Sequence, residues 1–164
     1  MLLHLQSLFV GDQKILPFET TCDLSSLEIS DSRPFRRPVT AQGEVVSAAG
    51  IVTLRLSICS TYEGDCDRCM TPFSREDRLH VEYTLVTSLN NEESDGYLLV
   101  ENFTLSLDEL VETEVLLALP SKNLCRKTCR GLCALCGKNL NEGDCDCQKQ
   151  TVDPRLEKLR QLLE

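Results

Sequence analysis

Residues 40–59 read TAQGEVVSAAGIVTLRLSIC, and this stretch has the clearest structural pattern in the chain. Apolar and polar side chains alternate on both sides of the turn-like AAG, and a period of two predicts strands that bury one face. Two such runs around a short turn predict a hairpin. Residues 78–88, RLHVEYTLVTS, alternate in the same way. We therefore expect three or more antiparallel strands in a meander.

The segments around this meander are less regular. The first 30 residues mix short apolar runs with polar breaks, which favours one or two strands and loops over a helix. Residues 30–39, SDSRPFRRPV, have the two prolines of a connector, and Arg33, Arg36 and Arg37 form a basic cluster there. Residues 90–96, NNEESDG, predict a polar turn, and residues 97–105, YLLVENFTL, predict a further strand.

One main helix is predicted over residues 106–119, within SLDELVETEVLLALP. Ser106 occupies the N-cap position and Glu109 follows three residues later, which is the capping-box pattern, and Pro120 ends the run. The apolar face that we expect to pack on the sheet comprises Leu107, Leu110, Val111, Leu117 and Ala118, widened by Leu116.

The fold class that follows is α+β, with an antiparallel, barrel-like sheet, one main packed helix and a small C-terminal zinc-binding module. We divide the chain into a mainly β domain (residues 1–121), a cysteine-rich module (122–150) and a short C-terminal helix (151–164). That last helix would begin at Asp153 as N-cap and Pro154 as first residue.

What ten cysteines indicate depends on whether the protein lies in a reducing or an oxidising compartment. No apolar run reaches 18 residues, and the N-terminal stretch MLLHLQSLFVGDQK lacks the positive flank and cleavage site of a signal peptide, so we expect a cytoplasmic protein with no membrane association. In a reducing compartment, crowded cysteines bind metal or perform redox chemistry. The alternative is a secreted chain held by disulfides.

Residues 125–147, CRKTCRGLCALCGKNLNEGDCDC, contain six of the ten cysteines. Cys133 and Cys136, followed by a glycine, have the form of a zinc knuckle, in which backbone amides donate to the sulfur atoms. A tetrahedral structural Zn²⁺ needs two further ligands, which would be Cys145 and Cys147 after the turn-rich loop, with Cys129 and Cys125 as competing candidates. Six thiols exceed one site, so two are spare or a second metal is shared. An iron-sulfur cluster is the alternative metal centre.

A second motif, CDRCMTPF at residues 66–73, lies at the turn between two expected strands. Cys66 and Cys69 could be half of a metal site, a redox dithiol or a structural part of the turn. A thioredoxin-like dithiol opens a helix, and Pro72 with the strand pattern after it opposes that interpretation. Cys22 and Cys59 stand alone, as small apolar side chains or near-surface thiols.

Charge is divided unevenly along the chain. Residues 1–121 have a net charge of −12 and residues 122–164 a net charge of +3, and no Lys or Arg occurs between Leu79 and Ser121. An acidic surface repels phosphates and attracts basic partners, although a charge run alone is also typical of a solvated face. We hypothesise that this surface binds a basic protein partner through Glu92, Glu93, Glu109, Glu112 and Glu114.

Two other functions remain open at this stage. Direct contact with the RNA backbone would use the basic tail with Arg33, Arg36 and Arg37, because no aromatic residue lies between Cys125 and Cys147 to stack on bases. A thiol oxidoreductase would use Cys66 and Cys69. Apart from these two cysteines, the sequence has no motif of a known enzyme class. His4 and His80 have no nucleophile motif beside them in the sequence, and no phosphate-binding glycine loop occurs. We expect a non-enzymatic protein without a small-molecule substrate.

Three separated motifs together resemble the YceD family, the large ribosomal RNA subunit accumulation proteins. CDRCMTPF and ELVETEVLLALP match elements general to that family, and CRGLCALCGKNLN resembles the extra cysteine module of its Gram-positive branch. The resemblance covers residues 40–150. It implies a cytoplasmic factor in large-subunit biogenesis and 23S rRNA accumulation, with 23S rRNA precursor or a basic large-subunit protein as partner. It assigns no catalytic residue.

Overall fold

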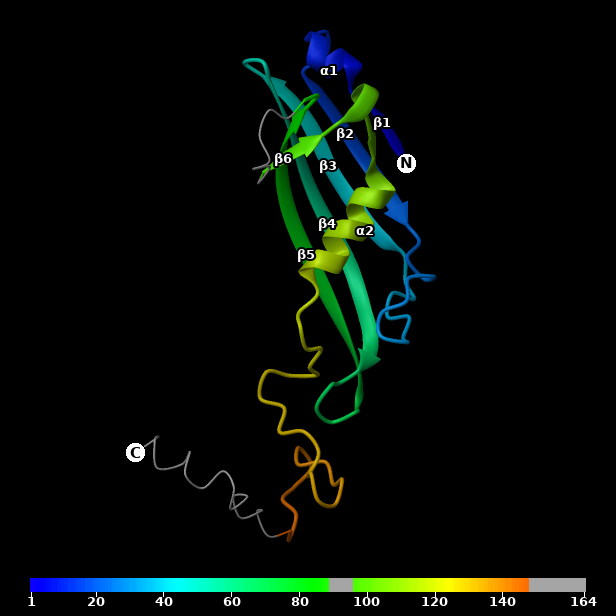
Figure 1. The fold of residues 1–164 in the computed structure, drawn as a ribbon, viewed down its shortest axis with the longest axis vertical. Helices are drawn as coiled ribbons and strands as arrows, with labels where there is room; N and C mark the ends of the chain where they lie inside the picture. The colour runs from blue at the N-terminus through cyan, green and yellow to red at the C-terminus, as the bar shows by residue number, and fades with distance from the viewer. Residues whose placement is uncertain (89–95, 148–164) are drawn as a thin grey trace, which may run out of the picture.

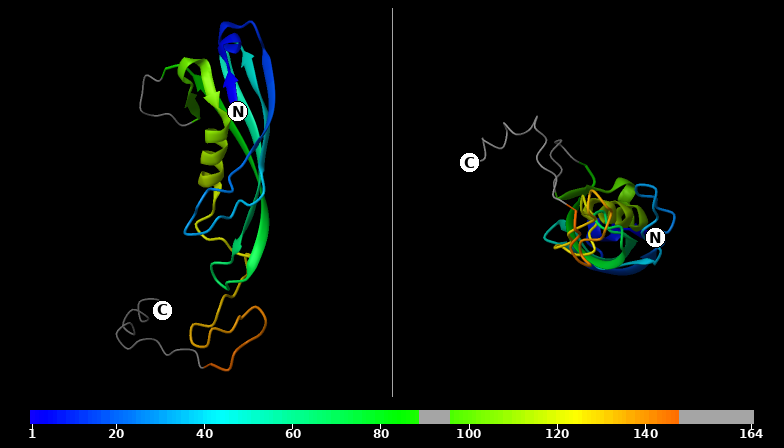
Figure 2. Two further views of the ribbon diagram at one scale, coloured as in Figure 1. Left: turned by 90° about the vertical axis from the view of Figure 1, so that its right-hand side faces the viewer. Right: turned by 90° about the horizontal axis from the view of Figure 1, so that it is seen from below.

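The structure is a computed structural model that describes residues 1–88 and 96–147. Its main element is a five-stranded sheet in the order β2-β3-β4-β5-β6, which curls into a half-barrel around helix α2 (Figures 1 and 2). A separate two-stranded sheet pairs β1 with β7. The elements are β1 (Leu2–His4), α1 (Gln6–Val10), β2 (Ile15–Cys22), β3 (Val39–Ala48), β4 (Ile51–Asp65), β5 (Pro72–Val86), β6 (Tyr97–Leu99), η1 (Glu101–Phe103), β7 (Thr104–Ser106) and α2 (Leu107–Ala118).

The predicted meander is confirmed. Strands β2 to β5 pair antiparallel in unbroken register, and the AAG segment forms a two-residue turn in which Ala49 and Gly50 have φ values of 50° and 80°. Two left-handed residues in succession give the turn whose twist matches a hairpin. The sheet is not wholly antiparallel, because β6 pairs parallel to β5 over Thr84–Val86. The molecule is mostly β, so the class α+β describes it only approximately.

Gly43 explains how β3 and β4 approach each other so closely. A Cβ atom at this position would lie 2.0 Å from the carbonyl oxygen of Arg55 and 3.0 Å from the ring of Phe18. Phe18 is the residue that faces Gly43 across β2 and β3. Only a residue without a side chain fits this close approach, as is common where sheets bend sharply.

Helix α2 packs into the concave face of the sheet along a narrower stripe than the sequence predicted. Leu107, Leu110, Val111, Glu114 and Val115 are buried. Leu116 and Leu117, which we expected on the packed face, are 39% and 75% exposed, and Ala118 is exposed as well. The prediction was wrong for these three because the sheet covers only one side of the helix, and they lie outside that side.

The N-terminus of α2 is satisfied differently from the predicted capping box. Ser106 is the N-cap, but its side chain makes no capping hydrogen bond. The backbone N–H of Leu107 instead donates to the carbonyl oxygen of Met1 at 2.9 Å, and the N-terminal ammonium group pairs with Asp108. Met1, rather than the Ser106 side chain, therefore supplies partners to the first turn of α2.

The N-terminal region and the connector contribute more to the core than their sequence suggested. A short helix, α1, lies where we expected strands and loops, and its Leu8 is buried. Within the connector, Pro34 and Phe35 are fully buried while its arginines are exposed. The helix predicted within residues 151–164 lies outside the described residues.

Candidate metal centres

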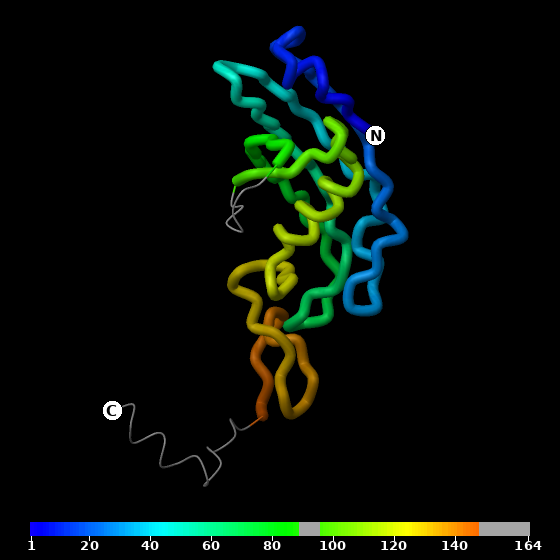
Figure 3. Tube along the Cα trace, turned by 45° about the horizontal axis from the view of Figure 1, so that its top comes forward, coloured from blue at the N-terminus to red at the C-terminus, as the bar shows by residue number. Residues whose placement is uncertain are grey.

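Eight of the ten cysteines lie in two groups, each with its four sulfur atoms within 4.8 Å of one another. The hairpin thiol group comprises Cys66, Cys69, Cys125 and Cys129; the tail thiol group comprises Cys133, Cys136, Cys145 and Cys147. Each group could hold a metal ion. Both lie at the end of the molecule formed by the β4–β5 turn and the segment after α2, coloured yellow to orange in Figure 3.

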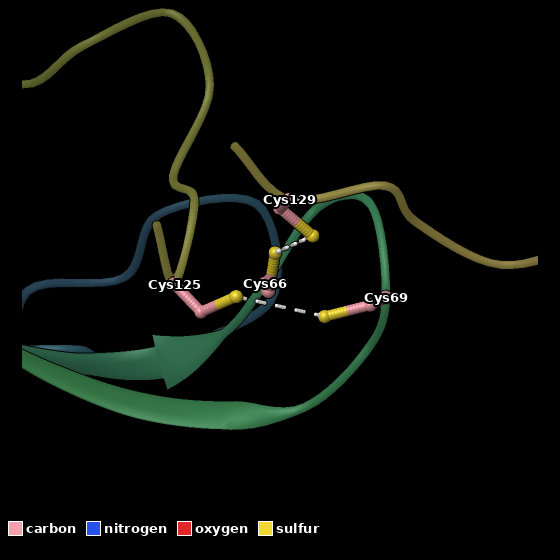
Figure 4. Close-up of side chains that lie close together, drawn as sticks. All are labelled: Cys66, Cys69, Cys125 and Cys129. Atoms are coloured by element: carbon pink, nitrogen blue, oxygen red, sulfur yellow. Dashed lines mark hydrogen bonds between the residues drawn. The ribbon is translucent and has the colours of Figure 1, made fainter. Parts of the chain in front are cut away.

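The hairpin thiol group shows where Cys125 and Cys129 belong, which the sequence alone did not decide. Cys125 and Cys129 are not spare ligands of the tail knuckle, because they lie beside Cys66 and Cys69 at the tip of the β4–β5 hairpin (Figure 4). The second metal position is therefore formed by two segments more than 50 residues apart. The sequence shows both halves of this group but carries no signal that pairs them.

The two C-x2-C motifs form the same backbone structure. We call residues 66–71 the hairpin knuckle and residues 133–138 the tail knuckle. In the hairpin knuckle, Cys66 N–H donates to Thr71 C=O at 3.0 Å and Met70 N–H donates to Cys66 C=O at 2.9 Å. The tail knuckle repeats this pattern, with Cys133 N–H to Lys138 C=O at 2.8 Å and Gly137 N–H to Cys133 C=O at 2.9 Å.

The residue after the second cysteine is left-handed in both knuckles. Gly137 has a φ of 73° and Met70 a φ of 56°. Glycine adopts this conformation without strain, whereas a side chain with a Cβ is strained there by about 1 kcal/mol. The sequence predicted this turn at Gly137 but gave no sign that Met70 would adopt it.

Sulfur spacing in the hairpin thiol group fits a single tetrahedral ion. Cys66 Sγ lies 3.8 Å from Cys129 Sγ, and Cys69 Sγ lies 3.7 Å from Cys125 Sγ (Figure 4). Metal–sulfur bonds of about 2.3 Å place the sulfur atoms of a tetrahedral site about 3.8 Å apart. These separations far exceed the length of a disulfide bond, which is about 2.05 Å.

Backbone contacts attach the segment after α2 to the hairpin tip. Asp67 N–H donates to Asn123 C=O at 2.9 Å, and Asn123 N–H donates to the Asp67 carboxylate at 2.6 Å. Arg68 makes two further contacts, since its guanidinium donates to Cys129 C=O at 3.0 Å and its C=O accepts from Leu132 N–H at 3.0 Å. The two halves of the hairpin thiol group are thus held together by hydrogen bonds as well as by any ion.

The electrostatics of the thiols match a site that is built for a cation. Burial alone would raise the pKa of Cys66, but hydrogen bonds from the backbone of Cys125, Arg68 and Cys69 outweigh it and lower the pKa to about 6. Burial and its thiol neighbours raise the pKa of Cys125 to about 12. Four adjacent thiols cannot all ionise without a positive charge among them, and a divalent ion would supply it.

In the tail thiol group, too, one cysteine has a lowered pKa and another a raised pKa, although these cysteines are less buried. Backbone hydrogen bonds from Cys136 and Leu135 lower the pKa of Cys133 to about 6. A hydrogen bond with Cys136, together with burial, raises the pKa of Cys147 to about 12. Cys136 is exposed, whereas Cys66, Cys69 and Cys129 are all buried.

The structure offers little to a redox function at Cys66 and Cys69. The two residues lie in the turn of a β-hairpin, and neither thiol lies at the N-terminus of a helix within the described part of the chain. They are 0% and 4% exposed, which leaves no access for a disulfide substrate. On the exposed face of the sheet, His80 Nδ1 and the Ser57 hydroxyl form a 2.9 Å hydrogen bond across β4 and β5, but among the described residues no side chain hydrogen-bonds the other ring nitrogen to orient it as a catalytic base.

The predicted partner-binding residues are distributed differently from our expectation. Glu109 and Glu112 are exposed on α2, but Glu114 is 8% exposed and accepts a 2.7 Å hydrogen bond from the Tyr83 hydroxyl. This contact raises the pKa of Tyr83 to about 12. Glu114 is therefore a core residue and is removed from the proposed surface. Glu92 and Glu93 lie outside the described residues.

The fold and the two thiol groups define a class: a mainly β protein whose curled sheet is joined at its hairpin end to a cysteine-rich segment with two metal-capable sites. Comparison with known families then places the chain. The model of the family described as "Large ribosomal RNA subunit accumulation protein YceD" matches residues 54–163, and the chain belongs to this family.

The family description implies a role in the accumulation of the large ribosomal RNA subunit, and it names no reaction. Searches of curated proteins and of solved structures found no match. Among the described residues, no helix has the length and apolar character needed to cross a membrane.

Proposed function

We propose that this protein supports large-subunit accumulation by binding a basic protein of the large ribosomal subunit on the outer face of α2. The observation that carries the proposal is the complete lack of Lys and Arg between Leu79 and Ser121, a stretch with nine acidic residues. Glu109 and Glu112 are exposed on the outer side of α2, opposite its buried stripe. A surface of one sign concentrates partners of the other sign and speeds their association.

The basic side chains at the hairpin end support this partner over RNA. Several of them already contact neighbours within the chain: Arg130 pairs with Asp144, Arg126 donates to Asn141 at 2.9 Å, and Lys138 donates to the carbonyl oxygen of Asp144 at 2.6 Å. In the connector, Arg37 pairs with Glu63 at 2.9 Å. The two ion pairs, Arg130–Asp144 and Arg37–Glu63, reduce the positive potential that a phosphate backbone would meet. The acceptors of Arg126 and Lys138 are neutral, so these two side chains keep their charge.

Zinc is the ion that best suits both thiol groups. Thiolate ligands in knuckles are typical of structural Zn²⁺, and four sulfur atoms within 4.8 Å surround a single ion more closely than an iron-sulfur cluster, whose cysteines bind separate iron atoms. Four thiolates around Zn²⁺ carry a net charge of about −2. Loading both groups would make the protein more acidic than its formal charge of −9, which again favours a basic partner.

The test uses the mixture of basic proteins extracted from purified large subunits. The zinc-loaded chain is immobilised, and binding is measured across a salt series for Glu109→Lys/Glu112→Lys. A matched control, Asp12→Lys/Glu19→Lys, makes the same charge change at exposed positions outside the acidic stretch. We expect the first variant to lose at least about tenfold in affinity and most of the salt dependence, with the control near wild type.

Unchanged binding and salt dependence in Glu109→Lys/Glu112→Lys would refute the proposed surface. If 23S rRNA fragments bound instead, with a steep salt dependence that survives this reversal, contact with RNA would replace it.

A further inference from the structure

One edge of strand β5 is unpaired over most of its length among residues 1–88 and 96–147, and this stretch is called the free edge of β5. The strand runs from Pro72 to Val86 and pairs with β4 on one side along its whole length. On the other side, β6 pairs only with Thr84–Val86. A free edge presents a row of N–H and C=O groups that another extended chain can bond.

The hydrogen bonds to β6 show which residues face this edge. Thr84 N–H donates to Gly96 C=O at 2.9 Å, and Val86 C=O accepts from Val100 N–H at 2.8 Å, so the backbone groups of even-numbered residues point outward. The pairing of β4 with β5 contains no bulge, so the same alternation of outward and inward backbone groups continues along the whole of β5. The outward backbone groups between Pro72 and Thr84 therefore belong to Ser74, Glu76, Arg78, His80 and Glu82. None of them forms a backbone hydrogen bond across this edge within residues 1–88 and 96–147.

The opposite edge of the sheet, formed by β2, is protected against pairing with another strand, whereas the β5 edge is not. On β2, Lys14 C=O accepts from Ser47 N–H at 2.8 Å, which places the odd-numbered residues of β2 toward solvent. Pro17 is one of them, and it has no N–H to offer an incoming strand. After Pro72, no proline interrupts β5.

Partly buried apolar side chains lie beside the β5 edge. Leu79, Val81 and Tyr83 are only partly buried on the concave side. A small cavity of about 70 Å³ lies between Leu79 and the end of α2, where Ala118 and Leu119 line it. The neighbouring outer face of α2 bears Glu109 and Glu112 and the exposed Leu116 and Leu117.

We infer that the free edge of β5 binds an extended, basic segment of the partner protein as an added strand. The inference rests on the proposed function and specifies its binding mode. Main-chain hydrogen bonds to Arg78, His80 and Glu82 would supply affinity, and alternate apolar side chains of the segment would contact the Leu79 side. Basic side chains suit the surroundings because no Lys or Arg occurs from Leu79 to Ser121, and Arg78, on the edge itself, is paired with Glu76 at 2.7 Å.

The test uses a labelled synthetic peptide of alternating Lys and Val as the probe, with the full zinc-loaded chain. A second peptide has the same sequence but N-methylated alternate amides, so it keeps the charge and loses strand pairing. We expect the first peptide to bind at least about tenfold more tightly than the second, and to slow amide exchange at Arg78, His80 and Glu82.

Proline variants provide a matched comparison of the two edges. His80→Pro removes one outward N–H in the middle of the β5 edge without changing formal charge, and Thr21→Pro does the same on the β2 edge. We expect His80→Pro to weaken peptide binding by about tenfold and Thr21→Pro by less than about twofold. The exchange measurement needs no variant, so it decides the question even if a proline variant fails to fold.

Three outcomes would overturn the inference: equal binding of both peptides, unchanged exchange along β5, or protection of the same amides by a second copy of the chain, seen as concentration-dependent dimers without peptide. If His80→Pro binds normally while Glu109→Lys/Glu112→Lys does not, the added strand is wrong and the acidic surface stands. If the reverse holds, the edge stands and the acidic surface is wrong.

Discussion

The hairpin and tail knuckles have the same backbone hydrogen bonds but occupy different surroundings. The hairpin knuckle obtains its other two thiols from Cys125 and Cys129, far along the chain, and three of its four cysteines are buried. The tail knuckle obtains Cys145 and Cys147 from the adjacent loop, and none of its cysteines is buried. The origin of the second thiol pair therefore determines whether a metal fastens two distant segments or only orders a short loop.

Removing one ligand from each group should separate these roles most strongly. Cys69→Ser is expected to lower the free energy of unfolding by about 3 kcal/mol or more, because a site that joins distant segments contributes directly to folding. Cys136→Ser should cost the β domain less than about 1 kcal/mol. Denaturant unfolding and metal analysis check this, with Cys59→Ser, outside both groups, as the control.

Equal losses of stability in Cys69→Ser and Cys136→Ser would show that the two groups do not differ in their structural role.

Metal release should follow the burial of the ligands. A chelator in excess is expected to remove one equivalent at least about tenfold faster than the second, because local opening of an exposed loop is far more frequent than opening of a buried site. Cys136→Ser should abolish the fast phase alone. A single phase for two equivalents in the wild type would contradict this order.

Asn141 supports the hairpin thiol group from the tail. Its side-chain N–H donates to Cys129 Sγ at 3.3 Å, and this contact lowers the pKa of Cys129. Its Oδ1 accepts from Arg130 N–H at 2.9 Å. Asn141→Asp keeps the acceptor and replaces the donor, so metal affinity of the hairpin thiol group should fall by about 10-fold to 100-fold. Competition with a chelator measures it, and an unchanged affinity would show that the contact is dispensable.

The smallest effect concerns the left-handed residue of each knuckle. Met70→Gly should relieve strain and stabilise the protein by up to about 1 kcal/mol, whereas Gly137→Ala should cost the tail knuckle a similar amount. Calorimetry with bound metal checks both. If Met70→Gly destabilises the chain, the side chain of Met70 makes contacts that outweigh its backbone strain.

The sequence predicted those features that depend on local pattern. Alternation around Ala49 and Gly50 indicated the meander, and the period after Ser106 indicated α2. It did not predict that Cys125 pairs with Cys69, since contacts across 56 positions leave no local pattern. The charge pattern also predicted that Glu114 lies on the solvent-exposed surface. It is buried instead, and its carboxylate accepts a hydrogen bond from the Tyr83 hydroxyl.

The most direct test of the proposed function is a sucrose-gradient ribosome profile with 23S rRNA quantified. Cells that lack the wild-type chain are complemented with it, with Glu109→Lys/Glu112→Lys, or with Asp12→Lys/Glu19→Lys. We predict that the wild-type chain and Asp12→Lys/Glu19→Lys restore free large subunits and 23S rRNA. Glu109→Lys/Glu112→Lys should leave both depleted while small subunits are spared. Full restoration by Glu109→Lys/Glu112→Lys would contradict the acidic binding surface, and a normal profile without any complementation would contradict the ribosomal role.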